Sequence, residues 1–161
     1  MTCSQIRAAE PDDRPALEPF LARWHSLRVA RRGELVHPLD HPMLVAEENG
    51  RLVGVLTDVV EGADCEVLTL HVDDRRRGLG STLIAEVKEI ARRAGCMRLW
   101  VITGNDNVDA LRFYQRRGFR LAAVRAGAVD ASRAGLKPEI PGIGAHGIPI
   151  RDEIELEQEL G

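Results

Sequence analysis

The chain has 161 residues, of which 44% are hydrophobic, and this is typical of one soluble globular domain spanning residues 1–161. The formal net charge of −3 argues against a general nucleic-acid binder. No stretch approaches the roughly 18 apolar residues of a membrane helix. The first 30 residues contain no uninterrupted apolar stretch, so we expect no signal peptide. Three separated cysteines predict a reducing cytoplasm.

The N-terminal part predicts a short edge strand over residues 5–8 and then a helix that opens at Pro11-Asp12-Asp13. Apolar residues then recur at three- and four-residue steps, which indicates an amphipathic helix. These residues are Leu17, Phe20, Leu21, Trp24 and Leu27. We expect a loop over residues 28–42, either irregular throughout or with a short helical turn, because this stretch is polar and carries Gly33, Pro38 and Pro42.

Three strands should follow. Residues 43–47 and 52–60 are joined by Glu48-Asn49-Gly50-Arg51, and Asn-Gly between apolar runs predicts a hairpin. A turn over residues 61–64 leads into a third strand, residues 65–72.

The next part alternates helices with strands. A clean apolar stripe predicts a helix from Gly78 to about Ala94. A strand over 98–103, a helix from the cap at Asp106 or Asn107 to Arg117, and a strand over 119–124 come next.

Composition then changes. Residues 137–149 are rich in proline and glycine and predict a long loop, which is often a lid or a binding loop. Residues 150–160 alternate apolar with acidic side chains and predict a last strand.

The turn between the third strand and the first long helix carries Arg75-x-x-Gly78-x-Gly80. Glycines let the backbone approach a ligand, and the free N–H groups that open a helix form an anion site suited to a pyrophosphate. A Walker loop is excluded because no lysine follows Gly80. A dinucleotide fingerprint is excluded because Leu83 stands where its third glycine belongs and no acidic residue follows about 20 residues on.

A second motif follows the strand 98–103. Its residues are Asn107, Ala110, Tyr114, Gly118 and Phe119. Together with the glycine turn, in this order and at this separation, it resembles the GNAT superfamily of acetyl-CoA-dependent N-acetyltransferases. The resemblance is firmest over residues 66–125. It implies an α/β (α+β) fold, with a mixed, mostly antiparallel sheet of about six or seven strands flanked by about four helices. Splayed central strands would hold acetyl-CoA.

The resemblance also implies which residues bind the cosubstrate. The strand 68–72 would hold pantetheine, and the N–H of Leu70 or His71 would polarise the thioester carbonyl. Asn107 would contact pantetheine or the carbonyl, or would serve only as a helix cap. The full set of expected cofactor-binding residues is Leu70, His71, Val72, Arg75, Arg76, Arg77, Gly78, Leu79, Gly80, Ser81, Asn107 and Ala110.

Tyr114, the one tyrosine of the chain, stands at the family position for the acid that protonates the departing CoA thiolate. Glu66 stands where some members keep a catalytic base, although it could also be an ordinary strand residue. His71 and the acidic residues Glu153 and Glu155 are competing bases, and other members use no dedicated base. Glu153 and Glu155 could alternatively attract a cationic amine.

Other functions remain open beside the enzyme. A non-catalytic acyl-CoA-binding or sensing domain would share the fold, and an arginine cluster could bind nucleotides, although few aromatic residues are available for stacking. We expect no metal, because His37 and His41 have no obvious third ligand near them. The acceptor is a small-molecule or protein amine, neither nucleic acid nor a membrane is expected as a partner, and homodimers are common in the family.

Overall fold

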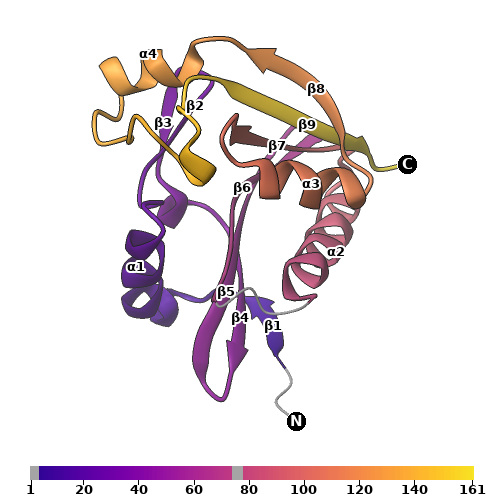
Figure 1. Ribbon diagram of the computed structural model, residues 1–161. Helices are drawn as coiled ribbons and strands as arrows, with labels where there is room; N and C mark the ends of the chain where they lie inside the picture. The colour runs from indigo at the N-terminus through magenta and orange to yellow at the C-terminus, as the bar shows by residue number, and fades with distance from the viewer. Residues whose placement is uncertain (1–3, 74–77) are drawn as a thin grey trace. The chain divides into compact units, whose positions relative to one another are not determined.

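The computed structural model describes residues 4–73 and 78–161, and its chain forms two compact units. The first unit contains the described residues up to 27, those from 37 to 99, and residues 160–161. The second contains residues 28–36 and 100–159. Figure 1 shows the elements of both units in chain order.

The first unit is built on four antiparallel strands in the order β1-β4-β5-β6. They are β1 (Gln5–Ala8), β4 (Met43–Glu48), β5 (Arg51–Glu61) and β6 (Asp64–Val72). Two helices, α1 (Arg14–Arg23) and α2 (Leu79–Arg93), complete this unit, with two short 3₁₀ turns at Pro11–Asp13 and Pro38–Asp40.

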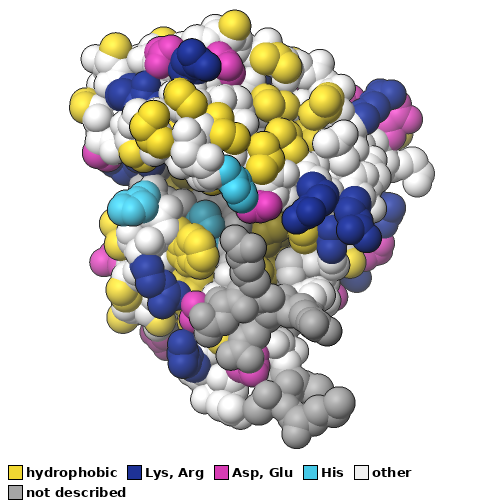
Figure 2. Space-filling view, in the orientation of Figure 1, with side chains coloured by type: hydrophobic (Ala, Val, Ile, Leu, Met, Phe, Trp, Pro, Cys, Tyr) yellow, Lys and Arg dark blue, Asp and Glu magenta, His cyan; other side chains and the backbone are white. Residues whose placement is uncertain are grey.

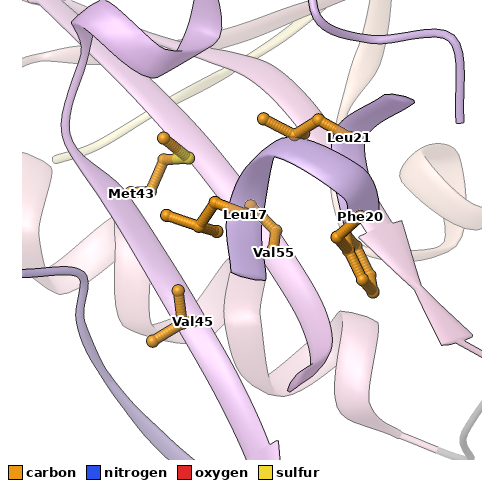
Figure 3. Close-up of a cluster of buried hydrophobic side chains, with 6 residues drawn as sticks. All are labelled: Leu17, Phe20, Leu21, Met43, Val45 and Val55. Carbon is orange, nitrogen blue, oxygen red and sulfur yellow. The ribbon is translucent and has the colours of Figure 1, made fainter. Parts of the chain in front are cut away.

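The two helices pack on opposite faces of this sheet. Apolar side chains of α1 form a buried cluster with one face of β4 and β5 (Figure 3). The cluster contains Leu17, Phe20, Leu21, Met43, Val45 and Val55. Neighbouring strand residues point to opposite faces, and a Cβ placed on Gly54 would lie 3.3 Å from Leu79 of α2. The apolar residues of α1 therefore cover one face of the sheet, and the apolar stripe of α2 covers the other.

The second unit contains three sheet strands in the order β7-β9-β8, with β8 and β9 antiparallel. These strands are β7 (Arg98–Gly104, whose first two residues belong to the first unit), β8 (Arg120–Arg125) and β9 (Glu153–Glu159). Its helices are α3 (Val108–Arg116) and α4 (Ala128–Ala134), with a 3₁₀ turn at Ala145–Gly147. A separate hairpin pairs β2 (Val29–Arg31) with β3 (Glu34–Val36).

The hairpin at Asn49-Gly50 is confirmed. Both residues have positive φ (54° and 74°), as a two-residue turn that matches the twist of its strands requires. Gly95 and Gly118 follow α2 and α3 with positive φ, as their positions in the sequence predicted.

Three expectations were wrong. The stretch 28–42 is not simply a loop, because Arg32 and Gly33 both take positive φ and close the β2–β3 hairpin. The first helix ends at Arg23 instead of continuing to Leu27, because His25 takes a left-handed conformation with φ 57°. The helix α4 was not foreseen, and the last strand begins at Glu153 rather than at Ile150.

The expected fold class is confirmed. In the described residues the two units contribute four and three sheet strands, mostly antiparallel, together with four α-helices. The splay of the central strands remains a prediction.

Candidate functional site

The strand β6 carries an irregularity in the middle of its pairing with β5. Thr57 pairs with Thr69 but Asp58 pairs with Val67, so Leu68 is an additional residue on β6. A bulge of this kind bends a strand and redirects its side chains, and bulges are frequent next to active sites. The segment from Leu68 to Val72, which the sequence predicts to hold pantetheine, begins at this bulge.

The helix α2 opens on an anion-binding geometry. Gly78 is its N-cap, in the left-handed conformation with φ 75°, which a residue without Cβ adopts at low cost. Both the N–H and the hydroxyl of Thr82 donate to the Gly78 carbonyl, at 3.0 and 2.9 Å. The first-turn N–H groups of a helix point away from its own hydrogen-bond ladder, and the dipole of this 15-residue helix adds positive potential.

This helix start is fixed by the core beneath it. Leu79 and Leu83 are buried against the sheet, where the absence of a side chain at Gly54 admits them. The predicted ligands Arg75, Arg76 and Arg77 lie outside the described residues.

The end of β6 is anchored to α1 and to the β4–β5 turn by one buried carboxylate. Asp73 accepts from Arg51 at 3.2 Å and lies 3.5 Å from Arg23. A pocket of about 550 Å³ opens beside this group, with Phe20 and Pro19 in its wall. Figure 2 shows basic side chains next to hydrophobic ones over α1.

Side chains at the end of β6 point alternately to the two helices. Leu70 pairs with Leu56 on the α2 face, and His71 pairs with Val55 on the α1 face. His71 stacks on Trp24, with ring centroids 5.1 Å apart and planes at 4°, and its Nε2 lies 2.7 Å from the hydroxyl of Ser26. Burial lowers the pKa of His71 to about 4. The imidazole is therefore uncharged at neutral pH.

The predicted base Glu66 lies farther back on the same strand. It pairs with Val59, which places it on the same face as Thr69 and His71, and it is 2% exposed. Because Leu68 is bulged, Glu66 and His71 lie opposite Val59 and Val55, four steps apart on β5, which is roughly 13 Å at the usual rise of a strand. The two candidate bases therefore lie at different points of the first unit.

The predicted acid Tyr114 lies on α3 in the second unit. Its side chain is 6% exposed and makes edge-on contacts with Phe113 and Phe119, each at 5.2 Å between ring centroids. Burial raises the pKa of Tyr114 well above its ordinary value. The phenol therefore keeps its proton throughout the working range of pH, as an acid requires.

The second motif also has a local structural role. The side-chain oxygen of Asn107 accepts from the N–H of Ala110 at 3.1 Å and caps α3. The cap interpretation of Asn107 is therefore confirmed, and only its amide NH₂ is left to donate to a ligand.

The structure gives no support to Glu153 and Glu155 as substrate carboxylates. Both are buried, at 3% and 4% exposed. Glu155 accepts from Arg32 and from Arg125, each at 2.8 Å, and Glu153 accepts from the backbone N–H of Arg32 at 3.0 Å. The guanidinium of Arg32 also stacks over Trp100 at 4.0 Å. Arginine side chains therefore already pair with the charge of Glu155, and the carboxylate of Glu153 is engaged by the backbone of Arg32.

The loop over residues 137–149 is held by side chains of the second unit. Arg133 donates to the carbonyls of Ile140 and Pro141, at 3.0 and 2.8 Å. Asp106, just before α3, accepts from the N–H of Ala145 at 3.0 Å, and Asp109 of α3 lies 3.0 Å from His146. Because most of these bonds involve polar groups at the surface, the loop has a defined path without a large apolar core.

No group of metal-binding side chains is found in the described residues. None of the helices in that part of the chain is both long enough and apolar enough to cross a bilayer.

The chain belongs to the acetyltransferase (GNAT) family, whose sequence model matches residues 5–119. It is 46% identical over 107 residues to the Bacillus subtilis protein YdhI, which is uncharacterised, and the match covers 66% of each chain. It is 39% identical over 135 residues to a mycothiol acetyltransferase of Clavibacter michiganensis, covering 77% of this chain but 44% of that protein. The chain thus spans just under two thirds of the first relative and less than half of the second.

A solved structure shares the fold. A GNAT family acetyltransferase from Elizabethkingia anophelis, with acetyl-CoA bound, matches with a TM-score of 0.67 at 21% identity and covers 97% of both chains.

Sequence reasoning identified α2, Tyr114 and β6 but missed the group formed by Trp24, Ser26 and His71. Ser26 and His71 are separated by 45 residues, and neither belongs to a local motif. The apolar spacing of the first helix included Trp24, and this spacing was the one signal in the sequence that predicted Trp24 to face the sheet.

Proposed function

We propose that this chain is an N-acetyltransferase that moves the acetyl group of acetyl-CoA to a primary amine by direct transfer. Membership of the family supports acetyl transfer, and the related Elizabethkingia enzyme binds acetyl-CoA. The observation that carries the proposal is the start of α2, where the left-handed N-cap Gly78 begins a 15-residue helix whose first turn and dipole suit an anion.

In this proposal the pyrophosphate binds at the first turn of α2, around Gly78 and Gly80. Arginine side chains from residues 75–77 add positive charge. The backbone of residues 70–72 binds pantetheine and polarises the thioester carbonyl, and the bulge at Leu68 supports this because it interrupts regular pairing just before that segment.

Transfer then needs one acid. The amine nitrogen attacks the carbonyl carbon, the carbon–sulfur bond breaks, and the CoA thiolate takes the proton of Tyr114. The buried phenol of Tyr114 is uncharged, so it carries a proton with which to hydrogen-bond to the departing sulfur or to protonate it.

The acceptor is a small molecule or a protein amine. Because Glu155 is paired with Arg32 and Arg125, and Glu153 is buried against the backbone N–H of Arg32, these carboxylates do not favour a cationic acceptor. A homodimer is proposed from the family resemblance alone.

The test is release of free thiol from acetyl-CoA across a panel of amines, for the wild type and for Tyr114→Phe. We expect amine-dependent turnover that falls roughly 10- to 1000-fold in the variant, the range of one acid–base group. Acetyl-CoA binding should be retained, because phenylalanine preserves the contacts with Phe113 and Phe119. Tight binding without turnover on any amine would favour the non-catalytic acyl-CoA sensor instead.

A further inference from the structure

Three residues of the first unit form a small polar group beneath an aromatic stack. His71 lies flat on Trp24, and its Nε2 is 2.7 Å from the hydroxyl oxygen of Ser26. That hydroxyl is also 3.2 Å from the backbone carbonyl oxygen of Trp24. Ser26 is 8% exposed, so water has little access to it. Its one proton must therefore serve two short contacts.

The proton of Ser26 decides how His71 is protonated. A carbonyl oxygen can only accept, so the contact with Trp24 is a hydrogen bond only if Ser26 donates to it. The hydroxyl oxygen then has a lone pair for His71, and the 2.7 Å contact is a hydrogen bond only if Nε2 carries hydrogen. The alternative, in which Ser26 donates to Nε2, leaves the Trp24 carbonyl without this donor. One arrangement therefore satisfies both contacts.

We propose that Ser26 is a positioning residue that holds His71 in the tautomer protonated at Nε2, so that Nδ1 accepts the proton of the acceptor amine. Nδ1 has no hydrogen-bond partner among the described residues. The chain Nε2–H to Ser26 to the Trp24 carbonyl also fixes the plane of the ring, which the stacking on Trp24 reinforces. This inference rests on the proposed acetyl transfer to an amine.

The surroundings keep the imidazole of His71 uncharged at neutral pH, and they make the imidazolium a short-lived form that gives up its proton readily. The charged or titratable groups nearest in the chain are Arg23 and His25 around the end of α1, and Asp73 on its own segment. None of them causes the shift in the pKa of His71, which burial alone lowers. Asp73 is in turn paired with Arg23 and Arg51.

The proton balance is complete without another reactant. The lone pair of Nδ1 takes one proton from the ammonium, leaving a neutral amine that can attack the thioester. The imidazolium keeps its bond from Nε2 to Ser26, and then returns the extra proton to solvent. In this proposal His71 is the base, and Glu66, roughly 13 Å away along the strand, takes no part in this proton transfer.

The direct test is the tautomer of His71, read by ¹⁵N–¹H correlation spectra of the imidazole nitrogens at pH 7 in the protein without substrate. The spectrum of His71→Gln assigns the signal among the five histidines of the chain. We expect hydrogen on Nε2 in the wild type and a shift towards Nδ1–H in Ser26→Ala, whose methyl group cannot accept. Ser26→Thr keeps a hydroxyl and should keep the wild-type tautomer.

Kinetics provide the second readout. Ser26→Ala should lower kcat by about 10-fold or more while the KM for acetyl-CoA changes less than about 2-fold, and Ser26→Thr should restore most of kcat. Thr57→Val is the matched control, because it also removes a buried hydroxyl hydrogen bond, 2.7 Å to Thr69, on the same face of the sheet. It should reduce stability without changing the tautomer.

Hydrogen on Nδ1 in the wild type, or an unchanged tautomer in Ser26→Ala, would overturn the positioning role. A full loss of activity in Glu66→Gln with normal turnover in His71→Gln would overturn the role of His71 as base. If no amine is acetylated by the wild type, the proposed function fails, whereas the tautomer measurement still decides the role of Ser26.

Discussion

Two titratable side chains, His71 and Tyr114, are both kept uncharged by burial, but in opposite protonation states. Burial lowers the pKa of the imidazole and raises the pKa of the phenol. At neutral pH the imidazole of His71 therefore carries one ring proton and has one acceptor nitrogen, whereas the phenol of Tyr114 retains its proton. Both shifts have the same cause, because burial disfavours the charged form of each group.

The lowered pKa of His71 predicts a pH dependence of stability. Its pKa is about 4 in the folded chain against an ordinary 6.5, so between these values the unfolded chain binds more protons. The contribution of His71 to the free energy of unfolding should therefore be fully present above pH 6.5 and should be lost as the pH falls towards 4. Urea unfolding from pH 7.5 to 4 measures this. His71→Gln should show a shallower decline, and equal slopes for the two proteins would contradict the assignment.

At the scale of elements, the start of α2 depends on the missing side chain at Gly54. A Cβ there would lie 3.3 Å from Leu79 and 3.5 Å from Leu83, which is closer than most packed carbons come. The first residue of α2, at the proposed pyrophosphate site, is therefore seated directly on the sheet.

Gly54→Val should displace the first turn of α2. Overpacking of this kind lowers stability by about 1–3 kcal/mol, and we expect a several-fold rise in the KM for acetyl-CoA with little change in the KM for the amine. Gly54→Ala should show a milder form of the same effect. If Gly54→Val clearly lowers stability but leaves the KM for acetyl-CoA unchanged, the first turn of α2 does not contribute to cosubstrate binding.

The loop over residues 137–149 offers a sharper pair of variants. A Cβ on Gly144 would lie 2.1 Å from the carboxylate of Asp106 and 2.6 Å from Ile150, whereas a Cβ on Gly142 would meet nothing within 4 Å. Gly144→Ala should thus dislodge the loop from Asp106, and Gly142→Ala should not.

If this loop is the lid over the acceptor, Gly144→Ala changes selectivity among amines more than it changes the KM for acetyl-CoA. Steady-state kinetics with two amines of different size measure both quantities, with Gly142→Ala as the control. Equal losses for amine and acetyl-CoA would show that the loop has no special role in acceptor choice.

At the scale of the whole molecule, the sequence predicted what local patterns determine. Periodicity located α2, the Asn49-Gly50 pair located the β4–β5 hairpin, and the spacing from Asn107 to Phe119 indicated the family. The family model covers residues that belong to both compact units, and we propose that the two units form one acetyltransferase domain.

The features that were missed depend on long-range contacts or on unusual backbone. The hairpin β2–β3 needs positive φ at Arg32, which no turn signature anticipates. The acidic residues of β9 look solvated in the sequence, yet Glu155 is buried by its pairing with Arg32 and Arg125. The contact of Ser26 with His71 joins two distant positions that carry no motif.

The central claim is acetyl transfer from acetyl-CoA to an amine, and mass spectrometry of the products tests it most directly. The wild type should move a ¹³C-labelled acetyl group from acetyl-CoA to at least one amine of the panel, with one free CoA thiol released for each acetylated amine. No acetylated amine at any pH from 6 to 9, from a protein that binds acetyl-CoA tightly, would contradict the account.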